Sequence, residues 1–185
     1  MSADHDVIFS QVQKTLEPLA LKPADYEEIK QLMITAMNKG LTLEGRENSS
    51  IRMYPSYVTT IPDGSESGSF LALDLGGTNY RVILAQMSGE KKSLLIEERT
   101  HAIPHEKMQG TGKELFEFIA QTLYEFLKIH SKLNEQLKLG FTFSFPCEQN
   151  GLNEAYLVRW TKGFDAKDVV GQNICKLLQD AIDSL

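Results

Sequence analysis

The chain of 185 residues has the length of one ordinary domain, and 42% of its residues are hydrophobic, which excludes a wholly disordered chain. Its 19 basic and 25 acidic side chains give a formal net charge of −6, which argues against broad binding to nucleic acid or to anionic membranes. Charge alone does not define a ligand, because a few fixed donors are enough to bind an anion inside an acidic protein.

Two further features indicate where the protein works. Cys147 and Cys175 lie far apart and outside any metal-binding spacing, which is typical of free thiols in a reducing compartment. The chain begins with acidic residues and no basic segment, and no apolar run is long enough for a signal or membrane helix. We therefore expect a cytoplasmic protein without a membrane anchor.

The first forty residues are predicted to form two helices. The first ends near Pro18, and the second begins near Pro23, because proline suits the first helical position. Apolar residues recur at helical spacing along the second helix, and Gly40 is expected to end it. Residues 41–69 are rich in Gly, Asn, Ser and Pro, so they are predicted to be mostly loop, with turns at residues 63–65 and 66–68.

From residue 70 onward the pattern alternates between strands and helices. Three strands joined by tight turns, one of them at residues 88–92, are predicted to form an antiparallel meander. A helix, a fourth strand, a hairpin and a final helix follow. In order, these elements are predicted at residues 70–75, 80–87, 93–102, 113–130, 139–145, 150–160 and 171–185.

The turn between the first two strands carries the most informative residues. Two adjacent glycines, Gly76 and Gly77, allow positive φ at both turn positions, and their bare backbone N–H groups allow close approach by a phosphate. Thr78 and Asn79 add side-chain donors. Asp74, at the end of a buried strand, is suited to hold Mg²⁺ through water, since this ion favours carboxylates and keeps much of its hydration.

An alternative reading of the glycine pair is a tight hairpin turn without a ligand, which is common. The pattern is neither the Gly-x-Gly-x-x-Gly of a dinucleotide fold nor a Walker A loop, so a nucleotide site needs further support.

That support comes from four stretches in one order and spacing. They are FLALDLGGTNYRV at residues 70–82, MQGTG at 108–112, LGFTFSFP at 139–146 and RWTKGF at 159–164. The first resembles the phosphate-binding hairpin of the sugar-kinase, Hsp70 and actin superfamily, and all four together resemble eukaryotic hexokinases. The resemblance runs from about residue 21 to the end of the chain.

The resemblance implies an α/β fold: a ribonuclease H-like, actin-like ATPase lobe, with a three-stranded antiparallel meander, a parallel strand and flanking helices. It implies an N-terminal helical segment at residues 1–20 and a small, sugar-binding lobe at 21–185 that is incomplete at its C-terminal end. The implied activity is phosphorylation of glucose, fructose or mannose at the 6-hydroxyl, with ATP as co-substrate and Mg²⁺.

The resemblance also implies two sets of site residues. The hexose would be held by Ser144, Phe145, Pro146, Thr161 and Lys162. The ATP phosphates would be held by Asp74, Gly76, Gly77, Thr78, Asn79 and Arg81, with Asp74 holding the metal through water.

The chemistry of the residues agrees with a hexose site, which needs short, fixed hydrogen-bonding groups. Along residues 141–145 the phenyl groups are expected to face a core, while Thr142 and Ser144 face the other side of the strand. Pro146 is expected to keep the strand end extended and Ser144 near its mouth. On spacing alone, Ser144 is an ordinary strand-end serine, and Thr161 and Lys162 are a turn residue and a solvated lysine.

The catalytic base expected by the resemblance, an aspartate in an Asn-Asp-Thr segment, does not occur in these 185 residues. We therefore expect the chain alone to lack activity, to bind glucose weakly, and to be weakly stable or to associate through the open edge of its fourth strand. The alternative function is a non-catalytic regulatory half or sugar sensor that binds glucose or glucose 6-phosphate. A purely structural domain is disfavoured, because packing alone does not require both sets of site residues.

Overall fold

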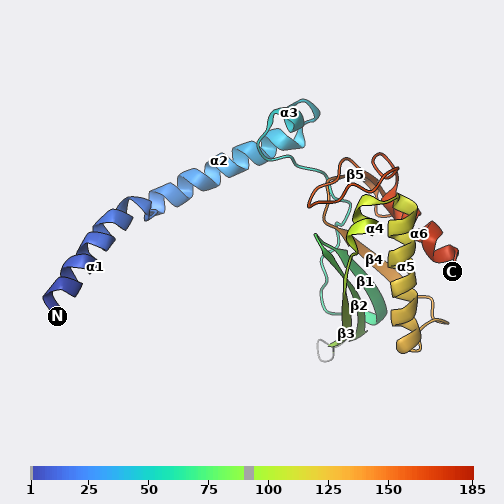
Figure 1. Ribbon diagram of the computed structural model, residues 1–185. Coiled ribbons are helices and arrows are strands. Elements are labelled where there is room, and N and C mark those ends of the chain that lie inside the picture. Colours follow the sequence, from blue (N-terminus) through green and yellow to red (C-terminus); the bar gives the residue numbers. More distant parts are fainter. Residues whose placement is uncertain (1, 90–93) are drawn as a thin grey trace. The chain divides into compact units, whose positions relative to one another are not determined.

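The computed structural model describes residues 2–89 and 94–185 (Figure 1). Contacts divide the chain into two compact units, Met1–Met53 and Tyr54–Leu185. The domain boundary predicted after residue 20 stays a prediction. Of the predicted turn at residues 88–92, residues 90–92 lie outside the described part of the chain.

The first unit consists of helices. α1 (Ser2–Leu16) passes into a 3₁₀ turn, η1 (Glu17–Leu19), and α2 (Pro23–Leu41) and α3 (Leu43–Asn48) follow. The predicted proline start of α2 is confirmed. No helix in the described part of the chain combines the length and apolar character needed to cross a membrane.

The end predicted for α2 differs by one residue, and residues 41–69 are mostly loop as predicted but also contain a short helix. α2 runs one residue beyond Gly40, whose role is to allow close packing, because a Cβ there would lie 2.1 Å from the carbonyl oxygen of Ile51. The predicted loop contains α3, which begins where the Thr42 hydroxyl accepts a hydrogen bond from the N–H of Gly45 at 2.9 Å. A short helix set by one such cap leaves almost no periodic signal in the sequence.

The second unit contains a four-stranded sheet with strand order β3-β2-β1-β4. Its strands are β1 (Ser67–Leu75), β2 (Asn79–Ser88), β3 (Leu94–Ala102) and β4 (Lys138–Phe143). β1–β2 and β2–β3 are antiparallel pairs, whereas β1–β4 is parallel. The predicted meander with an added parallel strand is therefore confirmed. The turn expected at residues 66–68 was wrong, since β1 already begins at Ser67.

Helices and a hairpin complete the second unit. They are α4 (His105–Gln109), α5 (Gly112–Ile129), the hairpin β5 (Cys147–Gly151) and β6 (Glu154–Leu157), and α6 (Ile174–Asp183). α5 lies against one face of the sheet (Figure 1). Its start follows a capping box in which Thr111 and Glu114 bond to each other's backbone N–H groups. α4 is too short to leave a periodic signal in the sequence.

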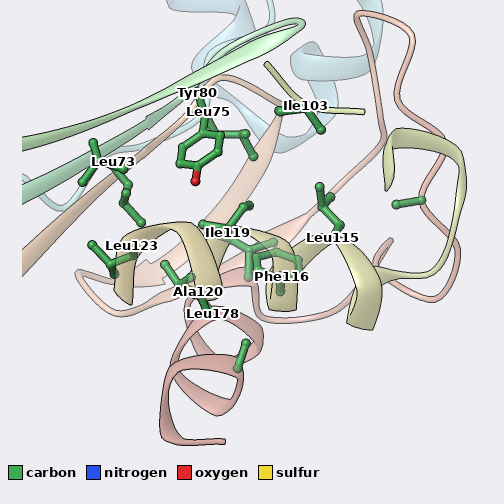
Figure 2. Packing of buried hydrophobic residues seen from close by; sticks show 14 of the residues in the cluster. Leu73, Leu75, Tyr80, Ile103, Leu115, Phe116, Ile119, Ala120, Leu123 and Leu178 are labelled. Atoms are coloured by element: carbon green, nitrogen blue, oxygen red, sulfur yellow. The ribbon is translucent and has the colours of Figure 1, made fainter. Parts of the chain in front are cut away.

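The core lies between the sheet and α5. Leu73, Leu75 and Tyr80 point from the sheet toward Phe116 and Ile119 of α5 (Figure 2), and all five are at most 1% exposed. Since strand side chains alternate, the residues between them, among them Asp74, lie on the opposite face. Burial of the apolar face thus fixes which side chains the sheet presents on its other side.

Candidate functional site

The glycine turn (residues 76–78) joins β1 to β2. The N–H of Gly76 donates a hydrogen bond to the carbonyl oxygen of Asn79 at 3.2 Å. The N–H of Ile103 donates one to the carbonyl oxygen of Thr78 at 3.0 Å. Neither Gly76 nor Gly77 has positive φ, so the positive φ that two glycines allow is not used at either position. The turn is wider than a two-residue hairpin turn and is held from outside by the N–H of Ile103.

The fold itself does not require glycine at either position. A Cβ on Gly76 would lie 3.4 Å from the carbonyl oxygen of Asn79, and one on Gly77 would lie 3.8 Å from Cδ of Lys162. Both distances are ordinary van der Waals contacts, and the backbone conformation is open to any residue. What two glycines add is a backbone that a bulky ligand can approach closely.

Asp74 lies on the sheet face opposite the core, one residue before the end of β1. The strand register places it beside Arg81 of β2 and Thr142 of β4. The Thr142 hydroxyl donates a hydrogen bond to Asp74 Oδ1 at 2.9 Å. The expected alternation of residues 141–143 is confirmed, because Phe141 and Phe143 pair with the core-facing leucines of β1 and Thr142 pairs with Asp74.

Ser144 is exposed and lies directly beside the glycine turn. Its backbone N–H donates to the carbonyl oxygen of Leu75 at 3.1 Å, and Leu75 precedes Gly76. β4 ends at Phe143 rather than at residue 145, because the N–H of Phe145 turns back to the carbonyl oxygen of Phe143 at 2.8 Å. The expected extended strand end at Ser144 was therefore wrong, and the chain bends there.

An aromatic cluster supports the residues that follow. The ring of buried Phe145 lies 4.8 Å from that of Trp160 and 4.9 Å from that of Phe164, both in edge-to-face geometry. Trp160 stacks on Phe164 at 5.3 Å and donates its Nε1–H to the carbonyl oxygen of Ala166 at 2.8 Å. Trp160 and Phe164 thus pack with Phe145 on either side of residues 161–163 and hold this stretch in place.

Pro146 joins this cluster to the hairpin. Its carbonyl oxygen accepts the N–H of Val158 at 2.9 Å. The hairpin comprises β5 and β6 and begins at Cys147, three residues before the predicted start at residue 150.

The lysine loop (residues 159–166) carries Thr161 and Lys162. Lys162 has φ of 56° and Gly163 of 80°, so the chain takes two consecutive left-handed residues there. The carbonyl oxygen of Thr161 accepts a hydrogen bond from the N–H of Phe164 at 3.1 Å. Gln109 donates its Nε2–H to the carbonyl oxygen of Gly163 at 2.6 Å. These bonds hold a loop conformation that a non-glycine residue rarely adopts.

Lys162 connects the two predicted sets of site residues. Its side chain passes beside Gly77, and its Nζ lies 5.6 Å from the centre of the Phe145 ring. With Ser144 beside the first glycine and Lys162 beside the second, the hexose and phosphate candidates share one region. Sequence reasoning did not identify Gln109 as a support of this region, although residues 108–112 were singled out as a motif.

The predicted metal ligand at the glycine turn is the carboxylate of Asp74. Within residues 2–89 and 94–185, no cluster of three or more His, Cys, Asp or Glu side chains could hold a metal ion. Asp74 offers a single carboxylate beside the turn. Such a group suits Mg²⁺, which retains waters and takes its other oxygens from phosphates.

Tyr80 and His101 form a stacked polar pair next to the glycine turn, with Tyr80 buried and His101 half-buried. Tyr80 follows Asn79 in β2, and its ring stacks on that of His101 at 5.0 Å. Burial raises the pKa of the Tyr80 hydroxyl, and burial followed by the charge of Arg99 lowers the pKa of His101. The Tyr80 Oη and His101 Nε2 atoms have no hydrogen-bond partner in the described part of the chain.

The two cysteines are free, as predicted. Burial raises the pKa of Cys147 to about 11, with the nearby Cys175 as a second cause. Burial also raises the pKa of Cys175. Both thiols are therefore protonated at neutral pH, and neither has the low pKa that a nucleophilic cysteine needs.

The mixed sheet, with a glycine turn in its first hairpin and a parallel strand beside it, defines an actin-like lobe. The hexokinase family model matches residues 11–185. The chain therefore belongs to the hexokinase family.

Relatives and solved structures agree with this membership. The chain is 53% identical to a hexokinase of Schistosoma mansoni over 176 residues, which are 95% of this chain and 39% of that protein. It is 46% identical to human hexokinase-2 over 171 residues, 92% of this chain and 19% of that protein. The chain thus spans less than half the length of the relatives it matches.

Among solved structures, a hexokinase from Schistosoma mansoni complexed with glucose is 52% identical, with a TM-score of 0.79 over 97% of this chain and 40% of that chain. A second hexokinase crystal structure is 30% identical, with a TM-score of 0.80 over 97% of this chain and 43% of that chain.

Proposed function

We propose that this chain forms the sugar-binding lobe of an ATP-dependent hexokinase that transfers phosphate to the 6-hydroxyl of glucose and related hexoses. The observation that carries this proposal is the meeting of two separate sequence motifs, with Lys162 beside Gly77 and Ser144 bonded to the residue before Gly76. The structure of the Schistosoma mansoni relative, described as complexed with glucose, supports the choice of substrate class.

In this proposal the hexose lies over Ser144 and the lysine loop. Ser144 and Thr161 supply hydroxyl groups, and Lys162 supplies a charged donor to a sugar oxygen. Phe145 and Pro146 shape the floor of the site, because the buried Phe145 ring fixes the backbone on either side of it. A site made of short side chains on a packed base limits the entropy lost when a sugar binds.

The ATP phosphates lie over the glycine turn in this proposal. The N–H groups of Gly77 and Thr78 and the side chain of Asn79 face the phosphates, and Arg81 adds positive charge from the next residues of β2. Asp74 holds Mg²⁺ through water. The ion, when bound, neutralises charge that develops on the transferred phosphoryl group. We assign no catalytic base within these 185 residues, and we place the protein in the cytoplasm.

The test joins these 185 residues to the remaining part of the Schistosoma mansoni hexokinase and measures glucose binding and glucose 6-phosphate formation. Trp160 is the only tryptophan of these 185 residues and packs on Phe145, so a fusion whose added part has its tryptophans replaced by phenylalanine reports on binding to the part contributed here. Ser144→Ala is expected to weaken glucose binding, whereas Ser67→Ala, an exposed serine of β1, is the matched control.

The fusion takes its catalytic base from the relative, so its outcomes show whether this lobe binds glucose and supports turnover. Turnover that depends on Ser144 supports the proposal. Glucose binding without turnover, with the Schistosoma mansoni enzyme active in parallel, favours the non-catalytic sugar-binding module. Loss of glucose binding in the fusion, despite a cooperative thermal transition, contradicts a hexose site in this lobe.

A further inference from the structure

The hydroxyl of Thr142 lies within hydrogen-bond distance of two acceptors. Its Oγ1 is 2.9 Å from Asp74 Oδ1 and 3.1 Å from the carbonyl oxygen of Leu73. A threonine hydroxyl carries a single proton, so it donates to one of them at a time. The bond to the carboxylate is the shorter and is charge-assisted, so Asp74 is the favoured acceptor.

This contact results from the strand register. The parallel pairing of β1 with β4 places Thr142 beside Asp74, on the face opposite the buried leucines. A shift of the register by one residue would turn Thr142 into the core and bring a phenylalanine to the position beside Asp74. The same packing that partly buries Phe141 and Phe143 against the core therefore places the Thr142 hydroxyl beside the carboxylate.

We propose that Thr142 is the positioning residue for Asp74, fixing the carboxylate so that its other oxygen is presented to the hydrated Mg²⁺ of a bound phosphate chain. This inference rests on the proposed function, because it requires phosphates over the glycine turn. Thr142 acts through Asp74, because the one proton of its hydroxyl is donated to the carboxylate. Loss of a bond that supports a direct metal ligand weakens metal binding by about 10-fold to 100-fold, and the loss through a water-bridged carboxylate is expected at the lower end of this range.

The Thr142 side chain also suits this role because its hydrogen bond restricts the orientation of the Asp74 carboxylate. The terminal torsion of an aspartate is broad, so an unsupported carboxylate rotates among many orientations. Arg81, the neighbour of Asp74 on the other side, is exposed and makes no side-chain hydrogen bond to Asp74 within the described residues. A short, branched hydroxyl residue on β4 instead supports the carboxylate from a rigid strand.

The experiment uses the 185-residue chain and inorganic tripolyphosphate, titrated with and without Mg²⁺ and followed by the amide NMR resonances of Gly76 and Gly77. Thr142→Val removes the hydroxyl and keeps the branched shape, and Thr142→Ser keeps the hydroxyl. Thr100→Val is the matched control, because Thr100 lies opposite Arg81 on the same face of the sheet. Thermal unfolding shows first that each variant is folded.

Thr142→Val is expected to bind tripolyphosphate alone as the wild type does, but to lose about 10-fold of the gain in affinity that Mg²⁺ gives. Thr142→Ser and Thr100→Val are expected to keep this gain. An unchanged Mg²⁺ gain in Thr142→Val overturns the inference and leaves the proposed phosphate site intact. Amide resonances that do not move in the wild type overturn the phosphate site itself, and with it this inference.

A second substitution keeps the inference testable if Thr142→Val does not fold. Thr142→Ala also removes the hydroxyl, without adding a second methyl group to this exposed position, and is expected to lose the same Mg²⁺ gain. A folded Thr142→Ala variant that keeps the full Mg²⁺ gain overturns the inference.

Discussion

The lysine loop and the glycine turn meet at the candidate site, but they are held in opposite ways. The lysine loop is fixed by its own packing, with Trp160 and Phe164 stacked against the buried ring of Phe145. The glycine turn is fixed from its ends, by the two strands and by the bond from Ile103, while its backbone carries no side chain at Gly76 or Gly77.

This difference separates residues required by the fold from residues available to a ligand. Gly163 is needed where it stands, because its φ of 80° is strained for any other residue. The fold does not require glycine at Gly77, so the missing side chain at this position is available for close approach by a ligand. The following predictions test this contrast, beginning with the largest expected effect.

Phe164→Ala is expected to destabilise the second unit by about 3–5 kcal/mol, because it removes a buried ring and leaves a cavity beside Trp160 and Phe145. Chemical denaturation followed by Trp160 fluorescence measures the change. Leu152→Ala, at a side chain that is 75% exposed, is the control and should cost little. A loss below about 1 kcal/mol would show that the aromatic packing does not hold the lysine loop.

Gly163→Ala is expected to destabilise by about 1–2 kcal/mol, since an L-residue pays this cost in the left-handed region. The same denaturation experiment applies. The loop should also lose its bond from Gln109, which is visible as a shift of that side-chain amide resonance. If Gly163→Ala and Gly77→Ala had equal effects on stability, the contrast between the two segments would be refuted.

Gly77→Ala is expected to leave stability unchanged or to raise it by about 0.4–1 kcal/mol, because its conformation is open to alanine and the unfolded chain loses freedom. Its added methyl contacts Lys162 at an ordinary distance. Tripolyphosphate binding should nevertheless weaken, since the methyl group keeps phosphate from the N–H groups. Unweakened binding in a stable Gly77→Ala variant would remove the argument for a phosphate site.

The pH dependence of stability tests the role of His101, which stacks on Tyr80 in the strand that follows the glycine turn. Its folded pKa is lowered by burial and by Arg99, so the unfolded chain binds the proton more readily. The stability contributed by neutral His101 is therefore complete above the ordinary pKa of 6.5 and declines as the pH falls through the lower, folded pKa. Thermal unfolding from pH 7.5 to pH 5 should show this decline.

His101→Phe keeps a ring to stack on Tyr80 and removes the proton, so its melting temperature should depend less on pH over this window. An identical pH dependence in both proteins would show that the decline arises from other groups.

Much of the second unit could be predicted from its sequence. The apolar runs of β1 and β2 and the one-sided pattern of α5 are strong local signals, and their bounds agree with the structure to within three residues. The helix α3, the early end of β4 and the early start of β5 could not be predicted, because each depends on one or two hydrogen bonds between specific backbone groups.

The sequence by itself determined the glycine pair, the Ser144 strand, the Thr161–Lys162 pair and the order in which they occur. Only the tertiary structure decided that Lys162 lies beside Gly77, that Ser144 is bonded beside Gly76, and that Thr142 supports Asp74. The physical reason is the separation of the contacting residues along the chain. Local spacing determines which side of a strand a residue occupies. Contacts between residues 68 or more positions apart depend instead on strand pairing and aromatic packing.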